Sequence, residues 1–269
     1  MKRRLLVLFV AVMMLLLSAC GNSSESDELL IGMEAGYPPF NWTQKDDSNG
    51  AIPIKGSSEF ANGYDVQIAK KVAEALGKKP VAVKTEWDGL VLAVNSGKID
   101  LIMAGMSPTA KRAKQIDFSE AYYNSDLVLV VNAEGKYKDA TSLADFKGAR
   151  VVAQLNTFHD DVVDQIEGVN HLEAMADFPV MRVAVQTGKA DAYVAERPEA
   201  ESAQEAGINL KMIELTDGFE ASKEDTSIAV GLKKGNKDQE KINEAIGKIT
   251  EEERLSIMKD MQKAQGASK

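Results

Sequence analysis

The chain has 269 residues, 44% of them hydrophobic and 27% charged, and its formal net charge at pH 7 is −9. This length is sufficient to bury a substantial core in one or two domains. The acidic balance argues against nucleic acid as a partner, because nucleic-acid-binding surfaces are basic. A single cysteine excludes an intramolecular disulfide.

The first twenty residues have the pattern of a secretion signal. Basic residues precede an apolar run from Leu5 to Leu17, which is too short to span a bilayer. Small residues then lead to Cys20, an arrangement that resembles the lipobox of bacterial lipoproteins, in which the cysteine becomes the acylated first residue. We expect a signal peptide at residues 1–19 and a polar tether at 20–27. The mature protein would then be extracytoplasmic and held to the cell membrane by its lipid (palmitate) alone.

Segments typical of strands and helices alternate along the rest of the chain. In chain order we expect a strand at Leu29–Met33, a helix at Tyr64–Leu76, a strand at Val81–Thr85, a helix from Asp88 to Gly97, and a strand at Ile99–Ala104. Asp88 would cap the second of these helices. Residues 44–62 are polar and without clear periodicity, so we expect a long loop there, to which the sequence assigns no role. The alternation predicts an α/β fold with a largely parallel sheet.

The end of the Ile99–Ala104 strand has the composition of an anion-binding site. Gly105 and Ser107 follow the strand. Thr109 suits the N-cap of a short helix, and Arg112 falls on the first turn of that helix. Free backbone N–H groups, a hydroxyl and a guanidinium would converge there, which suits a carboxylate. By itself the run fits a capped surface helix with an exposed arginine equally well.

A faint internal repeat predicts two lobes of similar construction. Ser96–Asp100 (SGKID) precedes the first buried strand, and Thr187–Asp191 (TGKAD) precedes a strand that ends at Ala195. In sheets of this kind ligands bind beyond the carboxyl ends of the strands. Arg112 of the first half and Glu196 of the second half would therefore face a common cleft.

Two further strand-like segments, 126–131 and 226–232, have the positions expected for crossings between the lobes. The first lobe would then comprise residues 28–130 and 226–269, and the second lobe residues 131–225. The helices expected at 237–249 and 251–262 would return to the first lobe or its rim.

Six motifs, in this order, resemble those of bacterial extracellular solute-binding proteins of family 3, the amino-acid-binding components of ABC importers. They are Gly36–Phe40, Gly63–Asp65, Trp87–Leu90, Ser96–Asp100, Gly105–Arg112, and Asp117–Ser119 with Tyr122 and Tyr123. The resemblance implies a two-lobed periplasmic-binding-protein fold, with two crossing strands and the ligand in the cleft. It also implies a monomer without a cofactor, which captures a free L-amino acid and delivers it to the transmembrane subunits of an ABC permease.

The resemblance implies a role for each matching residue of the first lobe. Tyr37 and Trp87 match the aromatic residues that sandwich the side chain of the ligand. Gly105 matches a carbonyl that accepts from the α-ammonium, and Ser107 matches a hydroxyl contact. Arg112 matches the bidentate partner of the α-carboxylate.

The remaining contacts concern the second lobe and the ligand's side chain. Asn156-Thr157 matches the family's usual Gly-Thr at a helix start, where backbone N–H groups meet the carboxylate. Asparagine can adopt the positive φ that glycine would supply. Glu196 stands where the family usually has an aspartate for the α-ammonium. Glu34 matches an acid that contacts the ligand's side chain, which favours a polar or basic amino acid such as arginine, lysine or glutamine.

Each of these residues also has an ordinary structural reading. The aromatic residues could belong to the core, and Thr157 could simply cap its helix. Glu34 could point into solvent or pair with a lysine. Glu196 could form a solvated pair with Arg197 at a helix start.

Two other functions remain open. A secreted enzyme on the same fold could act on a small carboxylate in the manner of dehydratases, with Glu196 as general acid. Against this, the predicted cleft contains no histidine or cysteine. A sensor domain of a receptor is disfavoured because no transmembrane exit follows. His159 and His171, the only histidines, lie on different predicted elements, so we expect no metal site.

Overall fold

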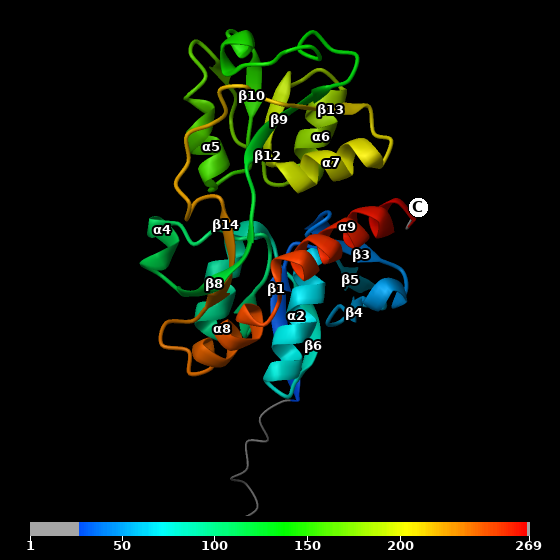
Figure 1. The fold of residues 1–269 in the computed structure, drawn as a ribbon, viewed down its shortest axis with the longest axis vertical. Coiled ribbons are helices and arrows are strands. Elements are labelled where there is room, and N and C mark those ends of the chain that lie inside the picture. Colours follow the sequence, from blue (N-terminus) through cyan, green and yellow to red (C-terminus); the bar gives the residue numbers. More distant parts are fainter. Residues whose placement is uncertain (1–26, 268–269) are drawn as a thin grey trace, which may run out of the picture.

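The computed structural model describes residues 27–267, so the predicted signal peptide and Cys20 lie outside the described residues. Two five-stranded sheets lie one above the other along the long axis of the molecule, and each is flanked by helices (Figure 1). Each sheet forms the centre of one lobe. Within residues 27–267, none of the helices combines the length and the apolar character that crossing a membrane requires.

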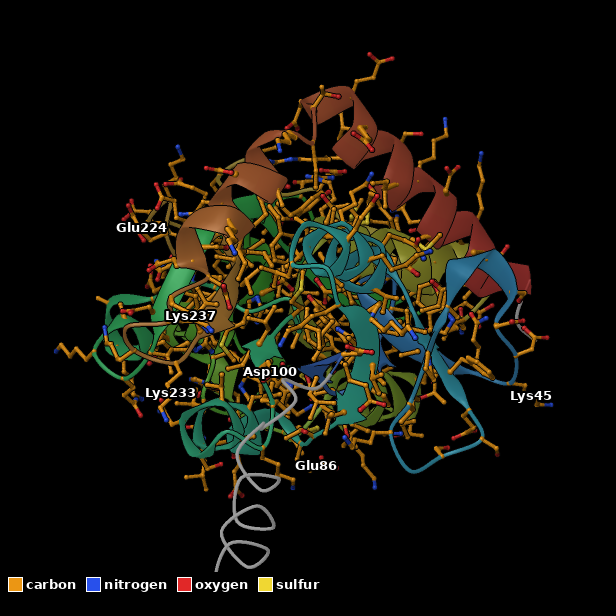
Figure 2. The ribbon with its side chains drawn as sticks, turned by 90° about the horizontal axis from the view of Figure 1, so that it is seen from below. Lys45, Glu86, Asp100, Glu224, Lys233 and Lys237 are labelled. Carbon is orange, nitrogen blue, oxygen red and sulfur yellow. The ribbon has the colours of Figure 1, made fainter. Side chains whose placement is uncertain are left out.

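The first lobe is built on a sheet with the strand order β6-β1-β7-β14-β8. β1 is parallel to β6 and β7, whereas β14 is antiparallel to β7 and β8. The elements of this lobe are β1 (Glu28–Met33), α2 (Tyr64–Ala75), β6 (Lys79–Lys84), α3 (Leu90–Ser96), β7 (Leu101–Ile102), α4 (Ala110–Ala113), β8 (Asp117–Asn124), β14 (Ser227–Leu232) and α8 (Gln239–Gly247). Charged side chains such as Lys45, Glu86 and Lys233 project outward from this lobe (Figure 2).

The second lobe has the strand order β11-β10-β12-β9-β13, in which β9 is antiparallel to both of its neighbours. Its elements are β9 (Leu127–Asn132), η4 (Leu143–Phe146), β10 (Arg150–Val152), α5 (Phe158–Val163), β11 (Asn170–His171), α6 (Phe178–Gln186), β12 (Ala192–Glu196), α7 (Arg197–Glu205) and β13 (Leu210–Ile213). β9 has the sequence LVLVVN and is buried except at its last residue. Such an unbroken apolar run is expected of a strand covered on both faces.

The polar segment 44–62 is not the long loop expected from the sequence, because its strands pair in a third, four-stranded sheet with the order β2-β3-β5-β4. Its strands are β2 (Gly36–Tyr37), β3 (Asn41–Gln44), β4 (Ile52–Pro53) and β5 (Phe60–Asn62), and η2 (Ser48–Gly50) lies between β3 and β4. The Gln44 side-chain amide donates to the Ser48 carbonyl at 2.9 Å, and the Asn62 amide donates to Gln44 at 3.1 Å. These hydrogen bonds join residues of the segment itself and stabilise the turn around η2.

The faint sequence repeat corresponds to the same turn in both lobes. α3 ends at Gly97, with φ 77°, and leads to β7. α6 is followed by Gly188, with φ 71°, and leads to β12. Glycine suits both positions because other residues rarely adopt a left-handed φ.

The chain crosses between the lobes just before β9 and again just before β14. The predicted crossings at 126–131 and 226–232 are mostly sheet strands: β9 belongs to the second sheet and β14 to the first. The crossing segments themselves are joined by a hydrogen bond from the Ser125 N–H to the Thr226 carbonyl at 3.0 Å. The lobe boundaries at 28–130, 131–225 and 226–269 remain a prediction.

Two other local predictions differ from the structure. Asp88 does not cap a helix: it lies inside a short 3₁₀ helix, η3 (Trp87–Gly89), and α3 has Gly89 at its N-cap without a side-chain hydrogen bond. Asp88 instead accepts a hydrogen bond from the Asn156 amide of the second lobe at 2.8 Å. The strand expected at Ile99–Ala104 is reduced to β7, because its carboxyl end turns away into the region of the predicted site.

The last helix, α9 (Glu251–Ala267), extends beyond the predicted range and contacts both lobes (Figure 1). Near its start, Glu253 pairs with Lys71 of α2 at 2.6 Å. Near its end, the Gln262 amide donates to Glu201 of α7 at 2.9 Å, and the Ser202 hydroxyl donates to Gln265. The expected return of the C-terminal helices to the first lobe therefore describes only part of α9.

Candidate ligand-binding site

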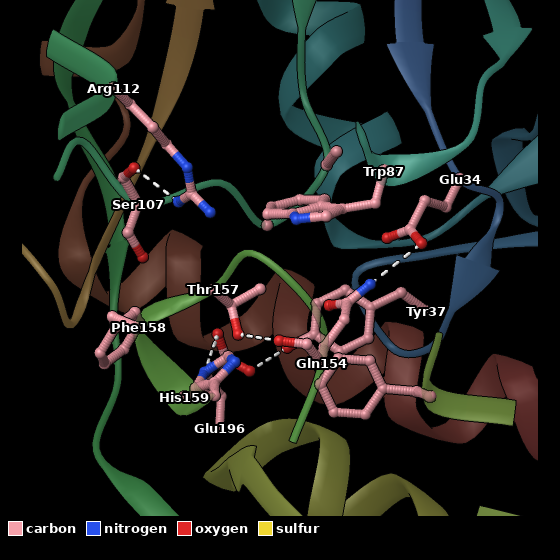
Figure 3. Close-up of a pocket in the computed structure, with 13 residues that line it drawn as sticks. Glu34, Tyr37, Trp87, Ser107, Arg112, Gln154, Thr157, Phe158, His159 and Glu196 are labelled. Atoms are coloured by element: carbon pink, nitrogen blue, oxygen red, sulfur yellow. Dashed lines mark hydrogen bonds and ion pairs between the residues drawn. The ribbon is translucent and has the colours of Figure 1, made fainter. Parts of the chain in front are cut away.

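A pocket lies between the two lobes, and all eight residues predicted as ligand contacts line it. The first lobe contributes Glu34, Tyr37, Trp87, Ala104, Gly105, Ser107 and Arg112. The second lobe contributes Gln154, Thr157, Phe158, His159, Phe178 and Glu196. Figure 3 shows these side chains converging from both lobes.

The pocket is nearly filled by its own side chains. Its cavity volume is about 10 Å³, which is room for about one water molecule. It adjoins an outer chamber of about 590 Å³, with which it shares Trp87, Arg112, Thr157 and Phe158. A ligand of amino-acid size must therefore displace contacts that the lining side chains make with one another.

Arg112 is positioned by the short helix α4. The Thr109 hydroxyl caps this helix by accepting from the Arg112 N–H at 3.4 Å, as predicted. The guanidinium donates to the Ser107 carbonyl at 3.0 Å and, across the cleft, to the Asn156 carbonyl at 3.2 Å. Neither acceptor is charged, so these hydrogen bonds do not neutralise the guanidinium. Burial lowers the pKa of Arg112 to about 10, although the attraction of Glu196 opposes the change.

The two predicted sandwich residues, Tyr37 and Trp87, both line the pocket. The Tyr37 ring stacks on Phe40, with ring centroids 4.9 Å apart, and on Phe178 of the second lobe, with centroids 4.4 Å apart. The face of Trp87 is covered by the Arg112 guanidinium, whose central carbon is 4.8 Å from the ring centroid. Both rings line the pocket, but their faces pack on other side chains of the protein, namely Phe40, Phe178 and Arg112.

Gly105 allows the close approach of Tyr37 to the first lobe. Its φ is +64°, and a Cβ at this position would lie 2.7 Å from a Tyr37 ring carbon. Behind it, the buried Asp65 accepts from the Asn41 amide at 2.8 Å and from the Tyr122 hydroxyl at 2.6 Å. Burial raises the pKa of Asp65 to about 7, against the effect of these hydrogen bonds. This network supports the inner wall of the pocket.

Glu196 ends β12 and is 4% exposed. One carboxylate oxygen accepts from the Tyr37 hydroxyl of the other lobe, and the second lies 3.2 Å from His159 Nε2. Burial raises the pKa of Glu196, but the attraction of His159 and the hydrogen bond from Tyr37 oppose burial, and the net effect lowers it. Arg197 pairs elsewhere, with Asp126 at 2.6 Å, so the alternative of a solvated Glu196–Arg197 pair is wrong.

Glu34 follows β1 and faces the second lobe. Its carboxylate accepts from the Gln154 side-chain amide at 3.1 Å, and the same amide donates to the Ala176 carbonyl at 3.0 Å. Burial raises the pKa of Glu34 to about 7, and the Gln154 hydrogen bond only partly offsets this. Glu34 therefore has neither the lysine partner nor the solvent-facing position of the alternative reading.

The loop before α5 has the conformation expected from the sequence. Asn156 has φ 58°, the left-handed value that asparagine adopts in place of glycine. Thr157 occupies the N-cap of α5, but its hydroxyl makes no capping bond and donates instead to the Gln154 carbonyl at 2.7 Å. The hydroxyl thus stabilises the loop that carries Gln154 and Asn156.

The sequence reasoning missed Gln154, Phe158, His159 and Phe178, and its expectation of a cleft without histidine was wrong. His159 is 4% exposed and lines the pocket. Its distance to Glu196 is that of an ion pair, but neither ring nitrogen makes a hydrogen bond with good geometry. The sequence offered one indication of His159: it lies on the first turn of the helix that begins after Asn156-Thr157, which were predicted to face the ligand. Among residues 27–267, no cluster of three or more His, Cys, Asp or Glu side chains could hold a metal ion.

Two lobes that enclose a pocket of aromatic and charged side chains define a binding protein for a small polar solute. The chain belongs to the bacterial extracellular solute-binding proteins, family 3, whose family model matches residues 29–261. This confirms the resemblance seen in the sequence and the two-lobed fold that it implied.

Related proteins are named for different amino acids. The arginine-binding extracellular protein ArtP of Bacillus subtilis is 26% identical over 96% of this chain and 97% of its own length. The L-cystine-binding protein TcyJ of Escherichia coli is 28% identical over 88% of this chain and 82% of its own. The arginine-bound structure of the ABC transporter substrate-binding protein AbpA of Streptococcus pneumoniae has 26% identity and a TM-score of 0.74, and the match covers 89% of this chain and 96% of that one.

Proposed function

We propose that this protein captures a free L-amino acid with a polar or basic side chain between its lobes and delivers it to an ABC permease. One observation carries the proposal. A guanidinium bonded only to carbonyl oxygens lies on the first lobe, and a buried carboxylate, Glu196, lies on the second, in the same pocket. These two charges complement the carboxylate and the ammonium of an amino acid.

Glu34 supports the choice of side chain. A cationic or amide-bearing group could replace the Gln154 amide as its hydrogen-bond partner. An aliphatic side chain would leave the half-buried carboxylate without a partner, which is costly, and an acidic one would be repelled. Relatives named for arginine and cystine are consistent with a polar ligand.

The location and the anchor are part of the same proposal. Family 3 proteins are extracellular. Acylation at Cys20 would tie the protein to the outer face of the cell membrane, with residues 20–27 as the tether between the lipid and the first lobe. Mass spectrometry of the protein from its native membrane should show a lipid-modified Cys20 at the amino terminus.

A thermal-shift screen tests the choice of ligand. L-arginine, L-lysine, L-glutamine, L-leucine and L-glutamate are each added at equal concentration. We expect one of the first three to raise Tm most, because a ligand at a hundred times its Kd stabilises by about 2.7 kcal/mol. The N-acetyl form of the best ligand lacks the ammonium and should have no effect. If leucine or glutamate is best, the role of Glu34 is wrong; if no amino acid binds, the proposed function is wrong.

We also propose that binding is not followed by a reaction. His159 and Glu196 form an acid–base pair in the pocket, so the enzyme alternative requires a direct test. The bound amino acid should be recovered unchanged after prolonged incubation with the protein, as judged by mass spectrometry. Dehydration or hydrolysis of any small carboxylate at a rate above the buffer control would favour the enzyme.

A further inference from the structure

His159 is a buried ionisable side chain that the proposed function does not use. Both of its ring nitrogens lack a hydrogen-bond partner, and it lies beside Glu196 in the pocket (Figure 3). Its nearest charged group is the Glu196 carboxylate, 3.2 Å from Nε2. Phe158 and Phe178 pack beside the imidazole, with ring centroids 4.6 and 6.3 Å away. Of these three contacts, only Glu196 can compensate a positive charge on the ring.

Both oxygens of the Glu196 carboxylate already face a side chain of the pocket. One oxygen holds the Tyr37 hydroxyl and the other faces His159. The cavity volume is about 10 Å³, so an arriving ammonium must take the place of an existing contact. Tyr37 is neutral, because burial beside Glu196 raises its pKa well above the usual range. The imidazole is the contact that can carry a positive charge.

We propose that a protonated His159 is the counter-ion of Glu196 before the ligand binds, and that the ligand's ammonium replaces it and expels its proton. This inference rests on the proposed function. Two cations against one buried carboxylate would repel each other at low local dielectric. The imidazolium therefore gives its proton to the solvent, and the neutral ring remains as a hydrogen-bond partner for the ligand. Acidification then weakens binding, because protons and ligand compete for the same carboxylate.

Other ionisable groups act on the same pocket and must be separated from His159. They are Glu34, Tyr37 and Arg112 of the first lobe, Asp65 behind Gly105, Glu199 of α7, and Asp160 and Asp161 on the same helix as His159. Glu34 and Asp65 are the important ones, since burial raises the pKa of each to about 7, in the range where histidine changes charge. A pH-dependent affinity alone would therefore not identify His159.

The protein has only two histidines, so NMR can follow each imidazole separately in an untagged sample. The Cε1–H signals are recorded between pH 5 and 8, with and without saturating L-arginine, L-lysine or L-glutamine, whichever gives the largest thermal shift. His171 is the internal control, because it pairs with Asp160 and Asp164 and does not line the pocket. The variant His171→Gln assigns the two signals.

We expect the ligand to move the titration midpoint of His159 to lower pH by at least about one unit, which corresponds to a tenfold coupling between ligand binding and protonation of His159. The midpoint of His171 should shift by less than about a fifth of that. Glu34→Gln should bind the ligand more weakly, but once saturated it should show the same shift of His159. Calorimetry then measures how much affinity each variant loses between pH 8 and pH 5.5. Glu34→Gln should keep the part of this loss that is due to His159. His159→Gln should still bind at pH 8 and should lack that part of the loss.

An unchanged His159 titration in the presence of a bound amino acid would overturn this inference and leave the proposed function intact. The same conclusion would follow if His159→Gln and the wild type lost affinity equally between pH 8 and pH 5.5. If no amino acid of the panel binds at any pH, both proposals are overturned.

Discussion

Arg112 holds its place in the pocket through two planar hydrogen bonds to carbonyl oxygens, those of Ser107 and Asn156. Lysine cannot reproduce this fork, because its ammonium is a point charge on a flexible stem. We expect Arg112→Ala to weaken amino-acid binding by about 2–5 kcal/mol, the range for removing one partner of a buried charged pair. Arg112→Lys should recover only a small part of the loss.

The matched control is Arg150→Lys. Arg150 forms a fork with Asp191 on the second lobe and does not line the pocket. Calorimetric affinity should stay at the wild-type value in this variant. Wild-type affinity in Arg112→Ala would remove Arg112 from the site.

Glu34 should make the unliganded protein less stable as pH rises. Burial raises the pKa of its carboxyl from 4.5 to about 7. Between these values the folded state keeps a proton that the unfolded state has lost, so the free energy of unfolding falls with increasing pH. Glu34→Gln mimics the protonated form and should stabilise the protein by roughly 2–3 kcal/mol more at pH 8 than at pH 4.5. Urea denaturation measures this difference; an equal effect at both pH values would contradict the raised pKa.

The residues that line the pocket could be predicted where a local motif fixes them. Gly105, Ser107 and Arg112 follow a strand end, and the sequence alone indicated their convergence. His159 was missed because its position two residues after Thr157, on the first turn of the same helix, does not by itself distinguish a pocket-facing histidine from a core one. Its proximity to Glu196 joins residues far apart in the chain.

At the scale of elements, local signals predicted helices and strands but not their partners in the other lobe. Asp88 is of a residue type, and at a position, typical of a helix N-cap. Its carboxylate instead accepts a hydrogen bond from the side-chain amide of Asn156, 68 positions away. The α9 helix begins with three acidic residues, as a helix start should. Its periodicity does not reveal that Gln262 contacts the second lobe.

The contact between α9 and α7 should influence ligand affinity. Gln262→Glu places a carboxylate against Glu201, whereas Gln262→Lys offers it a cation; both keep a good helix former. If α9 helps hold the lobes in the arrangement that encloses the pocket, repulsion lowers the population competent to bind and attraction raises it. An exposed pair is worth roughly 0.5 kcal/mol, so we expect opposite changes in Kd of about twofold.

Calorimetry at low ionic strength checks this prediction, because added salt should shrink both effects. A change in the same direction in both variants would mean that Gln262 acts through helix packing instead of through contact with Glu201.

At the scale of the whole molecule, the pocket is formed by contacts across the cleft. Glu34 meets Gln154, Arg112 meets Asn156, and Tyr37 meets Glu196. The sequence could predict two similar lobes and a common cleft, because repeated motifs report the build of each lobe. It could not predict how closely the lining side chains fill the cleft, since that depends on how the two lobes meet.

The central claim is that one amino acid bridges Arg112 and Glu196. A crystal structure with the most stabilising amino acid of the panel tests it directly. The ligand's carboxylate should accept from the Arg112 guanidinium, and its ammonium should donate to Glu196 in place of His159, each within about 2.7–3.2 Å. An ordered ligand in the outer chamber, with Arg112 still bonded to Asn156 and His159 still against Glu196, would contradict it.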